Sequence, residues 1–143
     1  MNNREKLNRA KLIALSSSYT NKQGRCIRIG AAIYDGNRLI ASSVNKNKTH
    51  SLMEYYNEEA LPFNRIPYLH AEIAALLKAR WEVGKENLNG MSIYIARRLN
   101  TNDGKYGLAS PCPACRKALI NAGIKKIVYT TNEGYAVEYV GKG

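Results

Sequence analysis

The chain has 143 residues and a mass of 16.0 kDa, which is the size of one domain. Hydrophobic residues make up 45% of it and charged residues 23%, and this composition excludes a disordered or fibrous protein. Its apolar runs are far shorter than the ~20 residues of a membrane span, and no apolar stretch follows the charged N-terminus. We therefore expect one cytoplasmic domain over residues 1–143, with no membrane partner.

Charge is the extreme feature of the composition. Lysine and arginine number 22 and acidic residues 11, which gives a formal net charge of +11 and a pI near 9.7. This excess favours anionic partners such as nucleotides, nucleic acid or an acidic membrane surface, although a basic surface can also serve solubility alone. The three cysteines are an odd number, which argues against a disulfide framework. Two of them form a close pair, which in a cytoplasmic protein indicates a metal or redox site.

The first half of the chain alternates helix and strand patterns. Residues 4–15 space their apolar side chains at three and four, which predicts a helix. Residues 27–34 and 38–44 are rich in strand formers and flank an Asp-Gly-Asn turn, which predicts a hairpin. A long polar connection over residues 45–69 follows, and connections of this length are usually functional. Residues 70–83 return to the helical period and end before a glycine.

The second half continues the alternation. A strand over residues 91–96 is followed by a polar loop over residues 97–110 and by a helix that starts near Pro113 and stops at Gly123. Two strands, at residues 125–130 and 135–140, end the pattern. Their connection is too short for the crossover of about a dozen residues that a parallel pair needs, so they must be antiparallel. The order predicts an α/β fold with helices on a mixed five-stranded sheet, and the two loops that lead into helices should meet at one end of it.

Metal-binding side chains stand at those two helix starts. His70 begins one helix, and Cys112 and Cys115 begin the other, so one imidazole and two thiolates are available to a single zinc ion. Structural zinc sites nearly always have four protein ligands, whereas catalytic sites have three and a water molecule. No fourth ligand stands close to either motif, and the positive helix ends favour thiolate over thiol. By itself, however, Cys-x-x-Cys also fits a thioredoxin-like redox pair.

Glu72 lies two residues after His70, close enough to reach a metal-bound water without being a ligand. A carboxylate in that place can act as general base on a water whose pKa zinc lowers to about 7. The chain order His-x-Glu and then Pro-Cys-x-x-Cys is the signature of zinc-dependent nucleobase deaminases. A non-catalytic nucleic-acid-binding module with structural zinc would not need this carboxylate.

Through these motifs, and over residues 27–140, the chain resembles the cytidine and deoxycytidylate deaminase superfamily. The resemblance implies a three-layer α-β-α fold, His70, Cys112 and Cys115 as zinc ligands, and Glu72 as the proton shuttle of the reaction. Relatives often place an asparagine after the second strand against the sugar or base, which Asn45 fits best. Relatives are also often dimers or tetramers, so we expect a homo-oligomer. An antiparallel end of the sheet resembles nucleoside and bacterial toxin deaminases more than deoxycytidylate or tRNA-adenosine deaminases, which insert a helix there.

The loops expected to rim the site are basic, and they also carry several aromatic residues. A phosphate-bearing substrate needs such a rim and a neutral nucleoside does not, so we predict a cytosine mononucleotide such as dCMP or CMP, with Arg97 and Arg98 as phosphate contacts. The alternative is a base in single-stranded DNA or RNA, since basic and aromatic residues together suit a strand. The basic residues of the two loops are Lys46, Lys48, Arg65, Arg97, Arg98 and Lys105.

Overall fold

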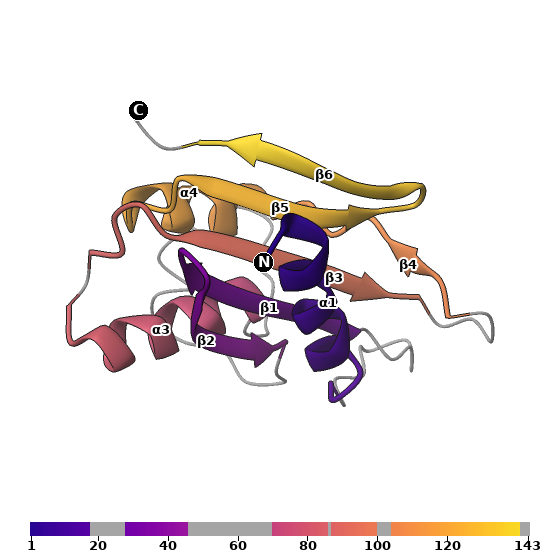
Figure 1. Cartoon of the computed structure of the whole chain (residues 1–143), viewed down its shortest axis with the longest axis horizontal. Coiled ribbons are helices and arrows are strands. Elements are labelled where there is room, and N and C mark those ends of the chain that lie inside the picture. Colours follow the sequence, from indigo (N-terminus) through magenta and orange to yellow (C-terminus); the bar gives the residue numbers. More distant parts are fainter. Residues whose placement is uncertain (18–27, 46–69, 86, 100–103, 141–143) are drawn as a thin grey trace.

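The computed structural model describes residues 1–17, 28–45, 70–85, 87–99 and 104–140 (Figure 1). The order of elements in these ranges matches the order predicted from the sequence, with one short strand added. The elements are α1 (Asn3–Ala14), β1 (Arg28–Asp35), β2 (Arg38–Val44), α3 (Ala71–Val83), β3 (Ser92–Arg98), β4 (Tyr106–Gly107), α4 (Pro113–Asn121), β5 (Lys126–Thr131) and β6 (Gly134–Tyr139).

The strands form one mixed sheet in the order β2-β1-β3-β5-β6, with β4 paired to β3. β1 is antiparallel to both β2 and β3, whereas β3 and β5 are parallel and are connected through α4. β5 and β6 are antiparallel, which confirms the prediction for the end of the chain. β2, β3 and β5 therefore point the same way, and the chain leaves β2 and β3 at one edge of the sheet before it enters α3 and α4.

The sheet separates two apolar clusters, which makes three layers. On one face, Ile33, Ile93 and Ile95 pack with buried residues of α3 and α4. On the other face, Tyr94 and Ala96 pack with buried residues of α1. Because neighbouring residues of a strand point to opposite faces, each strand serves both layers. Figure 1 shows α1 alone in front of the sheet and the other two helices behind it.

The structure corrects the predicted boundaries around β3. The strand was expected over residues 91–96 with a loop from Arg97 onward, but it extends to Arg98. The two extra residues pair with β4, Arg97 opposite Gly107 and Arg98 opposite Tyr106. The sheet thus has six strands rather than five. Arg97 and Arg98 belong to it, so their side chains take fixed and opposite directions.

A groove of about 670 Å³ lies between the edge strand β2 and α3, beside Trp81, whose side chain is 85% exposed. The groove contains none of the predicted site residues. Its lining is Leu39, Ile40, Ala41, Ser42, Leu77, Lys78, Trp81 and Glu82. None of the helices in the described ranges is long and apolar enough to cross a membrane.

α1 lies directly on the backbone of β1, and Gly30 makes this approach possible. A Cβ atom added at Gly30 would lie 2.4 Å from the carbonyl oxygen of Ala10 and 2.5 Å from the nitrogen of Ala14. Both are backbone atoms of α1, so only a shift of the whole helix could relieve the overlap.

We therefore expect Gly30→Ala to destabilise the protein by about 1–3 kcal/mol, the usual cost of overpacking. Urea denaturation of the zinc-loaded protein measures the effect. A free energy of unfolding equal to that of the unsubstituted chain would contradict this account of how α1 is packed.

Candidate metal centre and active site

Both ligand-bearing helices begin at a predicted zinc ligand. His70 is the N-cap of α3 and Cys112 is the N-cap of α4, and both have extended backbone conformations. Pro113 occupies the first turn of α4, where proline is tolerated because that amide has no intrahelical acceptor. The positive ends of two helices therefore meet at this place, and they favour negatively charged groups there.

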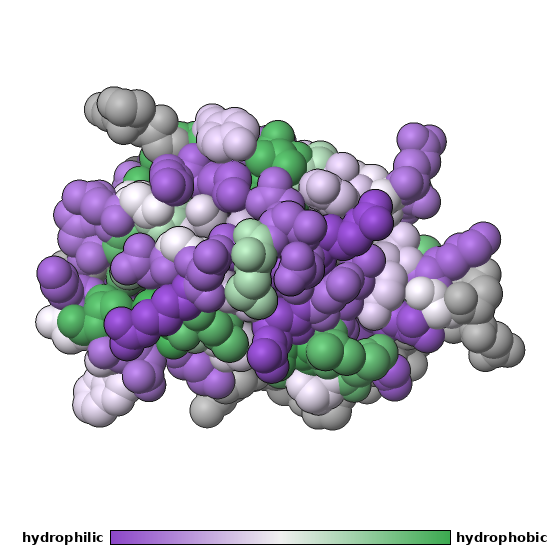
Figure 2. All heavy atoms as spheres, in the orientation of Figure 1, coloured by the Kyte–Doolittle hydropathy of each residue, from purple (hydrophilic) through white to green (hydrophobic). Residues whose placement is uncertain are grey.

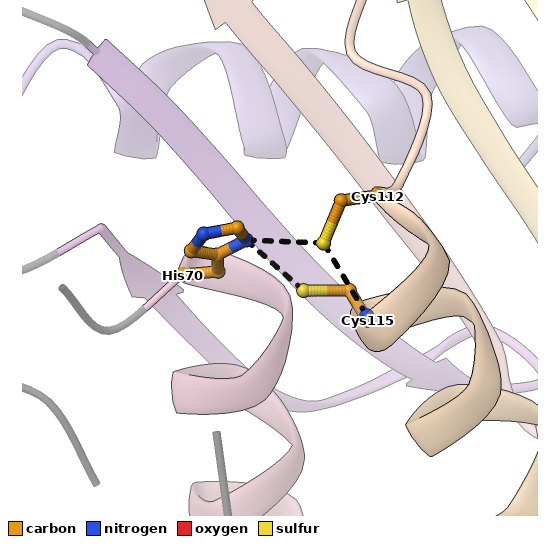
Figure 3. Close-up of side chains that lie close together, drawn as sticks. All are labelled: His70, Cys112 and Cys115. Atoms are coloured by element: carbon orange, nitrogen blue, oxygen red, sulfur yellow. Dashed lines mark hydrogen bonds between the residues drawn. The ribbon is translucent and has the colours of Figure 1, made fainter. Parts of the chain in front are cut away.

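The three ligand side chains point toward one another (Figure 3). His70 Nδ1 lies 3.1 Å from Cys115 Sγ and 3.5 Å from Cys112 Sγ, so Nδ1 is the nitrogen that faces the sulfurs. The ligand atoms of the three residues all lie within 4.8 Å of one another. His70 and Cys115 are buried, and Cys112 is partly buried.

These distances fit a zinc ion. With Zn–N near 2.0 Å and Zn–S near 2.3 Å, a nitrogen and a sulfur of one tetrahedral site are about 3.5 Å apart. The two measured separations, 3.1 and 3.5 Å, are close to that value. In the part of the chain that the structure describes, these three residues are the one group of histidine, cysteine and acidic side chains close enough to hold a metal ion. Three protein ligands leave a position for a further group, as catalytic zinc sites do.

The pKa values of the two thiols are shifted in opposite directions. Hydrogen bonding from Cys115 is the main cause that lowers the pKa of Cys112 to about 4, and the backbone amide of Cys115 also donates to Cys112 Sγ over 3.4 Å. Burial and the hydrogen bond to Cys112 raise the pKa of Cys115 well above its usual value. Cys112 therefore releases its proton more readily than Cys115, and metal binding at Cys115 must displace a proton.

The pKa of His70 is raised although its side chain is buried. Burial lowers its pKa, but the hydrogen bond with Cys112 and the charges of Glu72 and Cys112 outweigh that effect, and the net pKa is raised. Zinc needs the neutral imidazole, so protons compete with the metal at His70 as well as at Cys115.

Glu72 lies in the first turn of α3, with its side chain 5% exposed and next to the three ligands. Burial raises its pKa most strongly, the neighbouring Cys112 raises it further, and His70 opposes the change. Its carboxyl group also hydrogen-bonds with the Cys115 side chain. Glu72 is therefore a buried carboxyl group that exchanges a proton more readily near neutral pH than an ordinary glutamate.

Asn45 has a structural role in this arrangement. Its side chain is 2% exposed, and its Oδ1 accepts hydrogen bonds from Ser17 Oγ (2.7 Å) and from the amide of Ile29 (3.2 Å). These bonds tie the ends of β1 and β2 to the segment that follows α1. The register places Asn45, Ile29 and Arg97 in one row across β2, β1 and β3. A contact between Asn45 and the substrate stays a prediction.

Arg97 and Arg98 point to opposite faces of the sheet. Arg97 follows the alternation of Ile93 and Ile95 and is exposed on the α3–α4 side. Arg98 follows Tyr94 and Ala96, and its guanidinium carbon lies 5.6 Å from the centre of the Tyr106 ring on the α1 side. The two cannot hold the same phosphate group from these directions. Of the other predicted basic residues of the rim, Lys105 is exposed just before β4, whereas Lys46, Lys48 and Arg65 lie outside the described residues.

The structure also shows a group of polar side chains, not predicted from the sequence, that connects α4 to the sheet. Arg116, which follows Cys115 directly, forms an ion pair with Glu138 of β6 and donates to Ser110 Oγ over 3.1 Å. Tyr129 of β5 donates to the other carboxylate oxygen of Glu138 over 2.9 Å. The hydrogen bond from Arg116 is the main cause that lowers the pKa of Glu138. This group connects the segment before Cys112, the first turn of α4 and the edge of the sheet.

Replacing Cys115 with serine should remove zinc and lower the melting temperature, because metal binding contributes to folding free energy. Cys26→Ser is the matched control, since Cys26 stands outside both motifs, and it should retain one zinc per chain. Metal analysis of protein purified without chelators gives the stoichiometry. Protein that lacks zinc, or a Cys115→Ser variant that keeps it, would contradict the assignment.

Comparisons with known proteins agree with this geometry. The family model described as the cytidine and deoxycytidylate deaminase zinc-binding region matches residues 1–131. No curated protein sequence matches. Among solved structures, a cytidine deaminase from Burkholderia pseudomallei is 18% identical with a TM-score of 0.65, and the match covers 98% of this chain and 94% of that one.

Two other solved structures with the same fold are of deaminases that act on different substrates. A dCMP deaminase from the cyanophage S-TIM5, in complex with dCMP and dUMP, is 22% identical with a TM-score of 0.59, covering 90% of this chain and 79% of that one. A structure from a study of A-to-I editing by tRNA:A34 deaminases is 24% identical with a TM-score of 0.56, covering 90% and 75%. These likenesses confirm the cytidine-deaminase-like fold. The family match over residues 1–131 shows that the chain belongs to the cytidine and deoxycytidylate deaminase family and carries its zinc-binding domain.

Proposed function

We propose that this protein is a zinc-dependent hydrolytic deaminase that converts cytosine to uracil in a mononucleotide such as dCMP or CMP. The observation that carries the proposal is the buried carboxyl group of Glu72 beside three metal ligands. A buried carboxyl is costly to keep unless it is paired or used, and a purely structural zinc site would not need it. The zinc ligands are His70, Cys112 and Cys115, which supply one nitrogen and two sulfur atoms.

Zinc in such a site lowers the pKa of a water molecule toward 7 and so supplies the nucleophile at neutral pH. Glu72 accepts the proton of the attacking water as the new C–O bond forms at C4 of the cytosine ring. It delivers that proton to the ring nitrogen N3. Glu72 then carries the proton of the new C4 hydroxyl group to the amino group, and the C4–N bond breaks as the C4 carbonyl of uracil forms and ammonia leaves. Burial raises the pKa of Glu72, which makes its carboxylate a stronger base than that of an ordinary glutamate.

Arg97 is the proposed phosphate contact. It lies at the end of β3 from which the chain continues toward Cys112, and its side chain is exposed on the face that carries the metal site. Its backbone amide donates to Thr130 Oγ1 over 3.1 Å, and Thr130 is fully buried, so the position of Arg97 is fixed while its guanidinium group stays accessible. The cyanophage dCMP deaminase of the same fold, in complex with dCMP and dUMP, supports a mononucleotide substrate.

The alternative substrate is a base in single-stranded DNA or RNA, and the tRNA:A34 deaminase structure of the same fold supports it. Glu72 and the metal ligands would act in the same way on such a base. A non-catalytic module with structural zinc is less well supported, because the described residues provide three clustered ligands where a structural site usually has four. The cytoplasmic location and the homo-oligomeric state stay predictions.

Glu72→Gln should reduce turnover about a hundred- to ten-thousand-fold, the usual contribution of a general acid–base group, while the protein keeps its zinc and its fold. Ammonia release from dCMP, CMP and cytidine measures the activity, and metal analysis of the same preparation measures the zinc. A variant that retains most of its turnover would rule out this role, whereas one that loses zinc would make Glu72 a ligand.

Arg97→Gln should raise KM for the mononucleotide about tenfold or more, because hydrogen bonds to charged groups contribute about 1.5–3 kcal/mol. The kcat for the mononucleotide and any activity on unphosphorylated cytidine should change little, since neither depends on the phosphate contact. Lys85→Gln, which removes one exposed charge beyond the end of α3, is the matched control. An equal loss of activity on cytidine and on the mononucleotide would contradict a phosphate contact.

A further inference from the structure

Several cations of the described residues lie on the face of the sheet that carries α1. Within the described residues, Lys6, Lys11, Arg98 and Lys126 form no ion pair, and the ion pair Arg116–Glu138 involves α4, on the opposite face. α1 itself has four basic residues and one acidic residue. Figure 2 shows that hydrophilic residues cover most of this face.

The first group of cations surrounds Tyr106. Lys11 Nζ lies 5.0 Å from the centre of the Tyr106 ring, and the guanidinium carbon of Arg98 lies 5.6 Å from it. Arg28 stands directly opposite Arg98 in the antiparallel β1–β3 pair.

The second group lies near the N-terminal end of α1, around Tyr94. Lys126 Nζ donates to Asn3 Oδ1 over 2.9 Å and lies 5.6 Å from the centre of the Tyr94 ring. Lys6 Nζ lies 5.8 Å from the same centre. Burial lowers the pKa of Lys6, and the charges of Lys126 and Lys125 lower it further. The field around this group is therefore positive.

We propose that the α1 face binds the sugar–phosphate backbone of a single-stranded nucleic acid, with Lys11 and Arg98 at one contact and Lys126 at another. The groups are anchored near Asn3 and Lys11, which are eight positions apart, or about 12 Å along α1. One phosphate cannot bridge that distance, whereas a polymer of phosphates can. The contact residues are only partly exposed, at the junction of α1 with the sheet. A narrow, flexible strand reaches such positions more easily than a rigid duplex or a flat membrane does.

This surface is separate from the metal centre, because α1 covers one face of the sheet and the helices that carry the zinc ligands cover the other. The proposal therefore does not rest on the substrate of the zinc site. It also gives Arg98 a binding role on the face toward which its side chain points.

The test is fluorescence anisotropy of a labelled single-stranded oligonucleotide with the full-length, zinc-loaded protein at increasing salt concentration. Each phosphate contact to a single strand contributes about 0.7 to the slope of log K against log salt. Lys11→Gln/Arg98→Gln removes one proposed contact and should therefore weaken binding and flatten the slope by about 0.7, and Lys126→Gln should flatten it by about the same amount. The control variant Lys78→Gln/Lys85→Gln also removes two positive charges, one in α3 and one just after it, and should leave the slope unchanged.

The zinc content and melting temperature of each variant show whether it is folded. If Lys11→Gln/Arg98→Gln does not fold, Lys126→Gln still tests the proposal. Absence of oligonucleotide binding, or equal slopes in the α1-face and control variants, would overturn the proposal. Tighter binding to a duplex of the same length, or to vesicles of anionic phospholipid, would also overturn it. Glu72→Gln should bind the strand normally, so failure of this proposal and failure of the proposed catalysis give different results.

Discussion

The structure depends on the meeting of two helix N-termini at one edge of a sheet. β2 and β3 point the same way, and each is followed by a connection that leads into a helix on the same face. The N-cap residues of these two helices, His70 and Cys112, are therefore brought to the same place, although they are 42 positions apart in the chain. The metal site is a consequence of this topology, because neither helix alone provides more than two ligands.

The same convergence explains the acid–base properties of the site. Two helix dipoles and a low-pKa thiolate share a small buried volume, in which opposite charges attract strongly and like charges repel. The pKa of Cys112 is lowered to about 4, mainly by the hydrogen bond with Cys115, whereas burial raises the pKa of Cys115 and, together with the charge of Cys112, that of Glu72. A divalent cation at this place would balance the thiolates. The three side chains are therefore placed to hold a metal, and Glu72 lies beside them, where the proposed proton transfer requires a carboxyl group.

Much of this could be predicted from the sequence. The helices, the hairpins and the antiparallel end follow from local periodicity and from the lengths of connections, and the two motifs contain the three side chains that the structure brings together. The directions of Arg97 and Arg98 could not be predicted, because they depend on β3 continuing through residues that look like loop. That extension depends on the two-residue strand β4, which is too short to have a sequence pattern of its own. The group of Arg116, Tyr129 and Glu138 was missed for a similar reason, since the register of β5 and β6 places Tyr129 and Glu138 near each other.

The most direct measurement of the central claim is X-ray absorption at the zinc edge of the purified protein. The account predicts two sulfur ligands at about 2.3 Å and two nitrogen or oxygen ligands at about 2.0–2.1 Å, one from His70 and one from solvent. The spectrum of the Glu72→Gln variant should be the same, because Glu72 is not a ligand. Three or more sulfur ligands, or a first shell that changes in the Glu72 variant, would contradict an open three-ligand zinc site with a separate proton-transfer residue.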